Sequence, residues 1–138
     1  MNKIVDFNKI GYVAATFEVD SATQAYLKAN HLNAATGNVD INGLNLAVKL
    51  GADGKVGFGA GAASDALLGF IMAYEADGFC SVQIGGGIDE VPTAAALVAG
   101  RKSLAVDAAG KVVLVEGARE VTVAKPSTSE NLFASIIL

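Results

Sequence analysis

The sequence predicts a mostly β protein: a compact antiparallel β-sandwich or barrel-like single domain, with one or two short helices and an extended N-terminal arm. Three observations predict this fold class. Several short segments alternate apolar and polar side chains with the period of two that marks a half-buried strand. Three similar turns, each closing on glycine, stand between such segments. The 138 residues are 52% hydrophobic and 17% charged, which is typical of one globular domain.

The clearest alternating segment is LNLAVKL, in which Leu44, Leu46, Val48 and Leu50 share one face. The same pattern predicts strands in VAATFEV, CSVQI, REVTVAK and, in a shorter form, SLAVD. KVVLVE, residues 111–116, is apolar on both faces. It is therefore either a central strand or a strand at an interface.

Three turns are expected at GADG (51–54), EADG (75–78) and DAAG (107–110). Each has residues suited to a type I turn, followed by a glycine that can adopt the left-handed conformation of a bulge. We expect each turn to reverse the chain into an antiparallel neighbour.

Two segments favour a helix. SATQAYLKANHLN can be capped by Asp20 or Ser21 and ended by Asn30 or Asn33. PTAAALVAG, residues 92–100, fits either a short helix that begins at a proline or an irregular loop. The expected inner side of the first helix carries small and aromatic residues: Ala22, Ala25, Tyr26 and Ala29.

The two ends of the chain are rich in apolar residues. Residues 1–12 are expected to form an N-terminal arm or a first strand, and residues 13–138 a single β-rich domain. LFASIIL at the C-terminus is expected to be a last strand, packed in its own barrel or against another chain. The N-terminus does not read as a signal peptide, and the longest apolar run, residues 66–74, is too short to span a membrane. We therefore expect a protein made in the cytoplasm, with no membrane partner.

The sequence offers few residues for catalysis or metal binding. His31 is the only histidine and is expected at the surface or at a helix end. Cys80 is the only cysteine and is expected to be a small buried hydrophobe. We predict no catalytic residues, no cofactor and no metal site. Five aspartates are interpreted as mostly solvated turn residues: Asp53, Asp65, Asp77, Asp89 and Asp107.

Two glycine-rich stretches, GGG (85–87) and GFGAGA (57–62), lack the context of a phosphate-binding loop. We interpret them as turns or closely packed backbone. Arg101, Lys102 and Lys111 form a small basic group, expected to be a solvated face or a contact for an acidic partner patch. The formal net charge of −4 argues against nucleic-acid binding, which requires a basic surface.

The order of motifs from residue 48 to residue 116 is VKLGADGKVGFGAG, SDALLGFIMAYEADGFCSVQIGGG, IDEVP and LVAGRKSLAVDAAGKVVLVEG. This order resembles the small cement or decoration proteins of tailed-phage capsids, over about half of the chain. Residues 21–43 are not part of the pattern, and Arg101 stands where an acidic residue is common. The matching positions are Val48, Leu50, Asp53, Gly54, Asp65, Leu67, Gly69, Phe70, Glu75, Asp77, Gly78, Val82, Gln83, Gly86, Val91, Pro92, Gly100, Val106, Asp107, Gly110 and Lys111.

The resemblance implies a structural protein of the virion that binds the outer surface of the mature capsid. It implies a homotrimer that bridges major capsid protein subunits, without catalysis, cofactor or nucleic acid. The alternatives are a small-ligand or glycan-binding β-barrel, the base domain of a head fibre, and an enzyme that uses Cys80 or His31. From the apolar ends and the two-sided strand we expect these interface residues: Ile4, Val5, Phe7, Ile10, Val112, Leu114, Phe133, Ile136 and Ile137.

Overall fold

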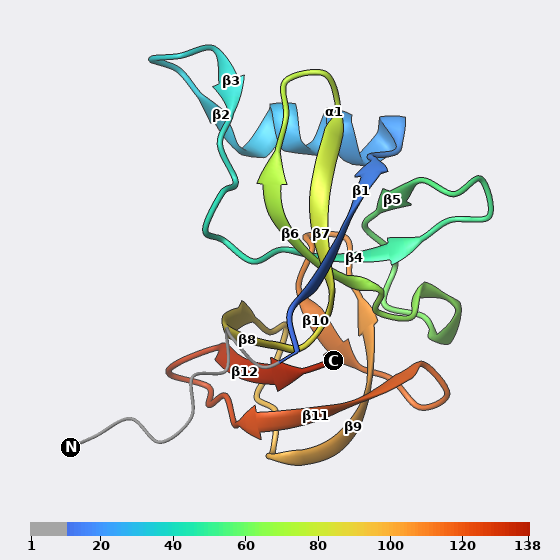
Figure 1. Cartoon of the computed structure of the whole chain (residues 1–138). Helices are drawn as coiled ribbons and strands as arrows, with labels where there is room; N and C mark the ends of the chain where they lie inside the picture. The colour runs from blue at the N-terminus through green and yellow to red at the C-terminus, as the bar shows by residue number, and fades with distance from the viewer. Residues whose placement is uncertain (1–10) are drawn as a thin grey trace.

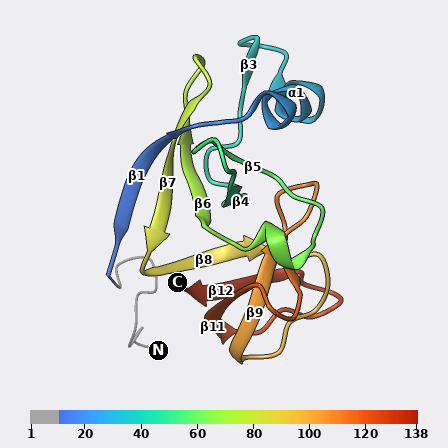
Figure 2. The same ribbon diagram turned by 90° about the vertical axis from the view of Figure 1, so that its right-hand side faces the viewer.

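A computed structural model describes residues 11–138, in which two five-stranded antiparallel sheets lie one above the other (Figures 1 and 2). The mostly β fold class is confirmed. One short helix and one 3₁₀ turn accompany the strands. The elements are β1 Val13–Glu18, α1 Ser21–Asn30, β2 Leu32–Asn33, β3 Asn38–Val39, β4 Ala47–Leu50, β5 Val56–Gly57, η2 Ala63–Asp65, β6 Gly69–Tyr74, β7 Phe79–Gly85, β8 Gly87–Pro92, β9 Gly100–Val106, β10 Val112–Leu114, β11 Arg119–Lys125 and β12 Phe133–Ile137.

The first sheet has the strand order β1-β7-β6-β4-β5, and the second has the order β10-β9-β11-β12-β8. The chain passes from the first sheet to the second at Gly86, between β7 and β8. Gly86 has a φ of 86°, which favours glycine. The side-chain amide of Gln83 donates to the carbonyls of Gly85 and Gly87, at 3.1 and 2.9 Å. The GGG stretch is therefore a tight corner between the sheets.

Each sheet curls until its two edge strands meet at one end. Val19, just after β1, forms a parallel bridge with Val56 of β5. Thr93, just after β8, forms a parallel bridge with Val112 of β10. An open edge strand exposes unpaired backbone N–H and C=O groups. The two bridges use some of these groups, so this part of each sheet is less able to pair with another chain.

The first sheet buries side chains on both of its faces. Adjacent residues of β4, Ala47 and Val48, belong to different apolar clusters, and so do Phe70 and Ile71 of β6. Successive side chains of a strand point to opposite faces. One cluster lies between the first sheet and α1, and the other lies between the two sheets. The first contains Val19, Leu27, Ile41, Leu46, Val48, Val56, Ile71, Cys80 and Val82; the second contains Ala47, Leu67, Phe70, Ile88, Val91, Leu97, Leu104, Val106, Val112, Val121, Val123, Ala134 and Ile136.

The prediction of a one-sided strand in LNLAVKL is wrong in part. Val48 and Leu46 are buried, but Leu44 and Leu50 are 41% and 50% exposed. The strand begins only at Ala47 because Asn45 has a φ of 56°, which interrupts the extended conformation.

The three predicted glycine turns are confirmed. Gly54, Gly78 and Gly110 have φ values of 79°, 88° and 78°. Each donates its N–H to the carbonyl three residues earlier, at 3.0, 3.1 and 3.3 Å. The turns join β4 to β5, β6 to β7 and β9 to β10, and all three strand pairs are antiparallel.

The predicted helix forms as α1, and Asp20 caps it by accepting the N–H of Thr23 at 2.7 Å. The expected inner side is right only for Tyr26, which is partly buried against the cluster beneath the helix; the fully buried residues are Thr23 and Leu27. Thr23 accepts the N–H of Phe58 at 3.0 Å, and Leu27 enters the cluster beneath the helix. The three predicted alanines, Ala22, Ala25 and Ala29, are exposed.

Of the two interpretations of PTAAALVAG, the irregular loop is confirmed. Pro92 ends the edge strand β8, and the loop is held by Ser127, whose Oγ accepts the N–H of Leu97 at 2.8 Å and the hydroxyl of Thr93 at 3.0 Å. This N–H is therefore bonded to a side chain and not to a helical carbonyl.

The two apolar segments near the C-terminus lie in the second sheet. KVVLVE forms β10, which is an edge strand and not a central one. LFASIIL forms β12, which lies between β11 and β8 and therefore packs within its own domain.

The buried Asp65 and the partly exposed Arg119 bind residues 57–68, which connect β5 to β6 and run beside β9. Asp65 is buried, so its interpretation as a solvated turn residue is wrong. Its carboxylate lies 2.6 Å from the Lys49 ammonium and accepts the N–H of Ala60 at 2.8 Å. From the second sheet, the Arg119 guanidinium donates to the carbonyl of Leu68 at 2.6 Å.

The Lys49 hydrogen bond and the N–H groups of Ala60 and Ala62 hold the pKa of Asp65 below its ordinary value of 3.8. A depressed carboxyl pKa stabilises the fold above the unfolded pKa, and this contribution is lost as pH falls through the folded pKa. We expect Asp65→Asn to lower the free energy of unfolding at pH 7 by about 2–3 kcal/mol. Urea unfolding of the unmodified protein and of the variant measures the difference between their free energies of unfolding. This difference should become smaller below about pH 4, where Asp65 begins to be protonated.

The matched control is Asp53→Asn, because Asp53 lies in the exposed turn before β5. We expect its effect to stay within about 0.5 kcal/mol. Equal losses for the two variants, or a loss in Asp65→Asn that is unchanged at pH 3, would contradict this role of Asp65.

Close backbone packing in the first sheet gives a second prediction. A Cβ at Gly69 would collide with the carbonyl oxygen of Gln83, whereas a Cβ at Gly37 would meet no atom within 4 Å. We expect Gly69→Ala to destabilise the protein by about 3 kcal/mol or more. Gly37→Ala, with a φ of 74° at Gly37, should cost only about 1 kcal/mol. Thermal unfolding of both variants checks that Gly69→Ala lowers the melting temperature more than Gly37→Ala does.

Candidate interaction surfaces

The nine predicted interface residues fall into three groups. Ile4, Val5, Phe7 and Ile10 lie outside the described residues. Val112 and Ile136 are fully buried in the core between the sheets, so their apolar character needs no partner. Leu114 and Phe133 are 57% and 46% exposed, and Ile137 is partly exposed.

Phe133 and Ile137 lie on the same face of the second sheet. Their strand neighbours Ala134 and Ile136 point into the core, so Phe133 and Ile137 point away from it. Ile137 is paired with Thr122 of β11, and Phe133 is paired with Pro92 of β8. We call these four residues (Pro92, Thr122, Phe133 and Ile137) the outer face of the second sheet.

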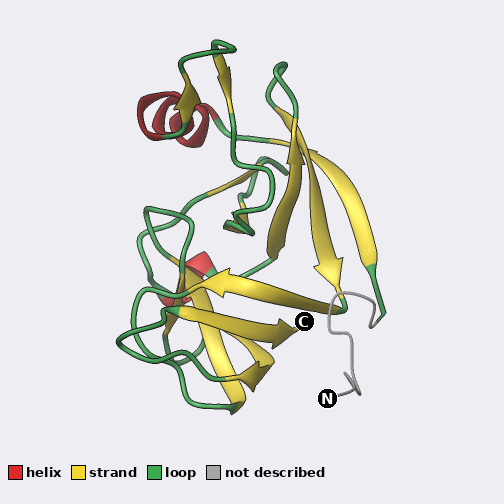
Figure 3. Ribbon diagram, turned by 90° about the vertical axis from the view of Figure 1, so that its left-hand side faces the viewer, coloured by secondary structure: helices red, strands yellow, loops and turns green. Residues whose placement is uncertain are grey.

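Several other apolar residues are exposed that the sequence patterns do not single out. Tyr12 is 52% exposed at the start of β1, and Val98 is 71% exposed in the loop before β9. Leu32, on the β2–β3 hairpin at the far end of the molecule from β12, is 52% exposed (Figures 1 and 3). At these positions, the alternation of apolar and polar residues in the sequence does not show whether the apolar side chain is exposed or buried.

The two candidate nucleophilic or basic residues have structural roles. Cys80 is buried in β7, and burial raises the pKa of its thiol to about 11. His31 caps the end of α1, and its backbone N–H donates to the carbonyl of Leu27 at 2.8 Å. The expected helix-end position of His31 and the expected burial of Cys80 are both confirmed.

The stretch GFGAGA packs closely against the second sheet, as expected. The N–H of Gly59 donates to the carbonyl of Asp107 at 3.2 Å, and that of Gly61 to the carbonyl of Val106 at 3.0 Å. The two N–H groups therefore form part of the fold. Of the basic group, Arg101 forms an exposed ion pair with Glu120 at 3.2 Å.

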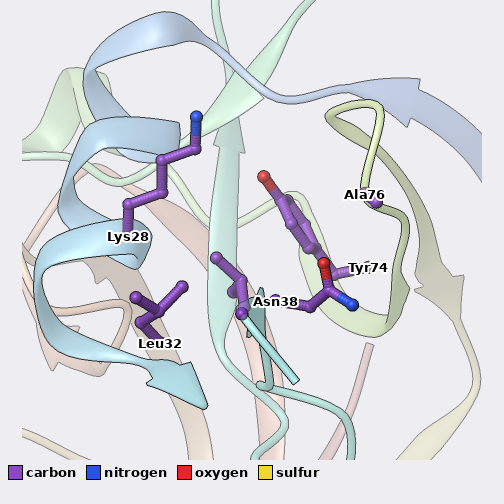
Figure 4. A pocket seen from close by; sticks show the side chains of 7 residues that line it. Lys28, Leu32, Asn38, Tyr74 and Ala76 are labelled. Atoms are coloured by element: carbon purple, nitrogen blue, oxygen red, sulfur yellow. The ribbon is translucent and has the colours of Figure 1, made fainter. Parts of the chain in front are cut away.

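A pocket of about 240 Å³ lies between α1, the β2–β3 hairpin and the β6–β7 turn; we call it the tip pocket (Figure 4). Its polar groups include the Lys28 ammonium, the Asn38 amide and the Tyr74 hydroxyl, and Figure 4 shows the ends of Lys28 and Tyr74 on the same side. Burial is the main cause that raises the pKa of Tyr74, so its phenol is a hydrogen-bond donor at neutral pH. Its lining is Lys28, Leu32, Gly37, Asn38, Val39, Tyr74 and Ala76.

A second pocket, of about 330 Å³, lies where the first sheet meets β8; we call it the junction pocket. It is lined by Tyr12, Gly43, Asn45, Met72, Gln83, Ile88, Asp89 and Glu90. Neither pocket contains a cysteine or histidine. Within residues 11–138, no group of three or more His, Cys, Asp or Glu side chains is arranged to hold a metal ion. Over the same residues, the helices are too short or too polar to cross a membrane.

No family model matches the chain, and no curated protein matches it.

The environment of Cys80 generates a prediction about catalysis. A thiol with a pKa of about 11 is almost entirely protonated at pH 8, and only the thiolate is a nucleophile. We expect native Cys80 to react with iodoacetamide at pH 8 about 100-fold more slowly than in 8 M urea. Mass spectrometry follows the labelling, with Cys80→Ala as the background. Labelling within minutes in the native state would return Cys80 to the candidate nucleophiles.

Proposed function

We propose that this chain is a structural cement or decoration protein that binds the outer surface of a mature tailed-phage capsid. In this proposal it acts in the virion as a homotrimer that bridges neighbouring major capsid protein subunits, and it is not an enzyme. The supporting observation is that motif residues of the resemblance occupy the positions that form the fold. Gly54, Gly78 and Gly110 are the turn glycines, and Gly86 is the corner between the sheets.

The proposed contact surface is the outer face of the second sheet together with Leu114 on the edge strand β10. Phe133, Ile137 and Leu114 are the predicted interface residues that remain accessible within the described chain. Residues 1–10 add four further apolar side chains to the proposal. A site that is repeated over a shell does not need high affinity per copy, because a trimer engages the lattice at several points.

The trimer and the contact surface are tested together by the double variant Phe133→Ser/Ile137→Thr. Burying one large apolar side chain contributes about 1.5–3 kcal/mol, and about 1.4 kcal/mol corresponds to a factor of ten in affinity. We expect this variant to dissociate to monomers in sedimentation equilibrium. Its occupancy on particles stripped of the protein should fall more than tenfold.

The matched control is Leu32→Ser, an equally exposed apolar residue on the β2–β3 hairpin. It should leave both the trimer and particle binding unchanged. Deleting β12 is not a usable test, since this strand lies inside the second sheet. If the double variant stays trimeric and binds particles like the unmodified chain, the outer face is not the contact surface. An unmodified chain that binds no shell contradicts the proposed function.

A small-ligand module is the second candidate, and the tip pocket is the observation that favours it. The pocket has a cation and a protonated phenol beside an apolar wall, so it fits a small anionic molecule better than a sugar, which prefers several aromatic platforms. A thermal-shift screen with small carboxylates, nucleotides and sugars tests this candidate. A melting temperature raised by a ligand in the native chain and not in Lys28→Ala would support it. The base domain of a head fibre is expected to have the same fold as a cement protein. The number of copies per particle distinguishes the two.

A further inference from the structure

The junction pocket is formed by parts of the chain that are distant in sequence. Met72 comes from β6, Gln83 from β7, and Ile88, Asp89 and Glu90 from β8. Tyr12 and the Gly43–Asn45 loop complete the lining. The pocket therefore exists only when the first sheet and β8 are correctly assembled.

Unusual backbone conformations fix the shape of this pocket. The two non-glycine residues with positive φ among residues 11–138 are Asn45 at 56° and Glu90 at 57°, and both line the pocket. Each such conformation costs about 1 kcal/mol and persists only where its surroundings hold it. The amide of Asn45 donates to the carbonyl of Asp89 at 2.8 Å, which ties the loop to β8. The pocket is therefore preformed.

The charged side chains that the described residues contribute to this pocket are acidic. Among residues 11–138, Asp89 and Glu90 contribute carboxylates to the pocket, and no lysine or arginine of this part of the chain lines it. The Asp89 carboxylate is held by the hydroxyl of Ser135, whereas Glu90 is exposed. Within the described chain, the ion pairs are Lys49–Asp65, Lys55–Glu18 and Arg101–Glu120, so none of them neutralises Glu90.

The pocket also offers apolar contacts next to these carboxylates. Met72 is partly exposed above the buried Ile88 and forms an apolar wall, and Tyr12 is 52% exposed. Leu44 lies between two lining residues and is 41% exposed. Lysine and arginine side chains combine an apolar stem with a charged head, and both can place that head near an aromatic ring.

We propose that the junction pocket binds one basic side chain, lysine or arginine, from the surface of a partner protein. The stem packs against Met72, and the cation lies close to Glu90 and the Tyr12 ring. That the partner is a capsid shell subunit rests on the proposed function; the preference for a basic side chain does not. Charge complementarity favours a basic occupant over an apolar one, because an apolar side chain would displace water from the Glu90 carboxylate without replacing its hydrogen bonds.

The test is an NMR titration of the full chain at low salt with three capped amino acids. The probes are the N-acetyl, N-methylamide derivatives of arginine, lysine and leucine. We expect the two basic probes to shift the amide signals of Asn45, Ile88 and Glu90 with saturation in the millimolar range. The leucine probe should shift them at least fivefold less at the same concentration. Raising NaCl from 50 to 500 mM should weaken the basic probes, because partly exposed charges are screened.

Glu90→Gln keeps the shape of the side chain and removes its charge. It should weaken binding of the arginine probe at least threefold, whereas Glu120→Gln, which changes an exposed glutamate on β11, should leave it unchanged. The proposal is overturned if the leucine probe binds as well as arginine, if the pocket signals do not move, or if Glu90→Gln has no effect.

Residues 1–10 contain Lys3 and Lys9, which are the competing occupants from the chain itself. If a Lys3→Ala/Lys9→Ala variant binds the arginine probe at least threefold more tightly, the pocket holds the chain's own lysine and the partner proposal fails. Unchanged affinity supports an external side chain. No capsid shell is present in these titrations, so a negative result would not contradict the proposed cement function. Likewise, a failure to bind particles would not contradict the preference of the pocket for a basic side chain.

Discussion

The fold depends on two adjacent strands, β4 and β6, that bury side chains on both faces. Ala47 and Phe70 face the second sheet, while Val48 and Ile71 face α1. The first sheet is consequently a middle layer, and its position determines where both other layers lie. Burial of apolar area drives this arrangement. The ion pair of Asp65 with Lys49, near the end of β4, fixes the position of the β5–β6 connection on this sheet. Candidate surfaces are what remains outside these layers.

Local sequence was sufficient to predict the features that depend on local chemistry. The turn glycines Gly54, Gly78 and Gly110 occupy left-handed positions, and Asp20 caps α1, as their residue types indicate. The inner position of Val121 and Val123 follows from alternation alone. These features are decided by residues within a few positions of one another, so a single sequence contains the information.

The features that sequence reasoning missed depend on contacts between distant segments. The inner side of α1 is set by Thr23 and Leu27 because Phe58 and the first sheet lie opposite them. Asp65 resembles a turn aspartate in sequence, and only the approach of Lys49 reveals its burial. The same limit affected the interface prediction: Val112 and Ile136 are as apolar as Leu114, but the curl of the second sheet places the first two inside. The junction pocket had no sequence signal, since its lining is assembled from segments far apart in the chain.

If this chain covers a capsid lattice as a structural protein, as we propose, its copy number per particle must match that of the lattice. Quantitative mass spectrometry of purified particles from the source compares this chain with the major shell protein. We expect a near-equal number of copies, because a protein that occupies the whole lattice is present once for each of its sites. A few copies per particle would indicate a fibre base or a tail component, and absence from particles would contradict the capsid assignment.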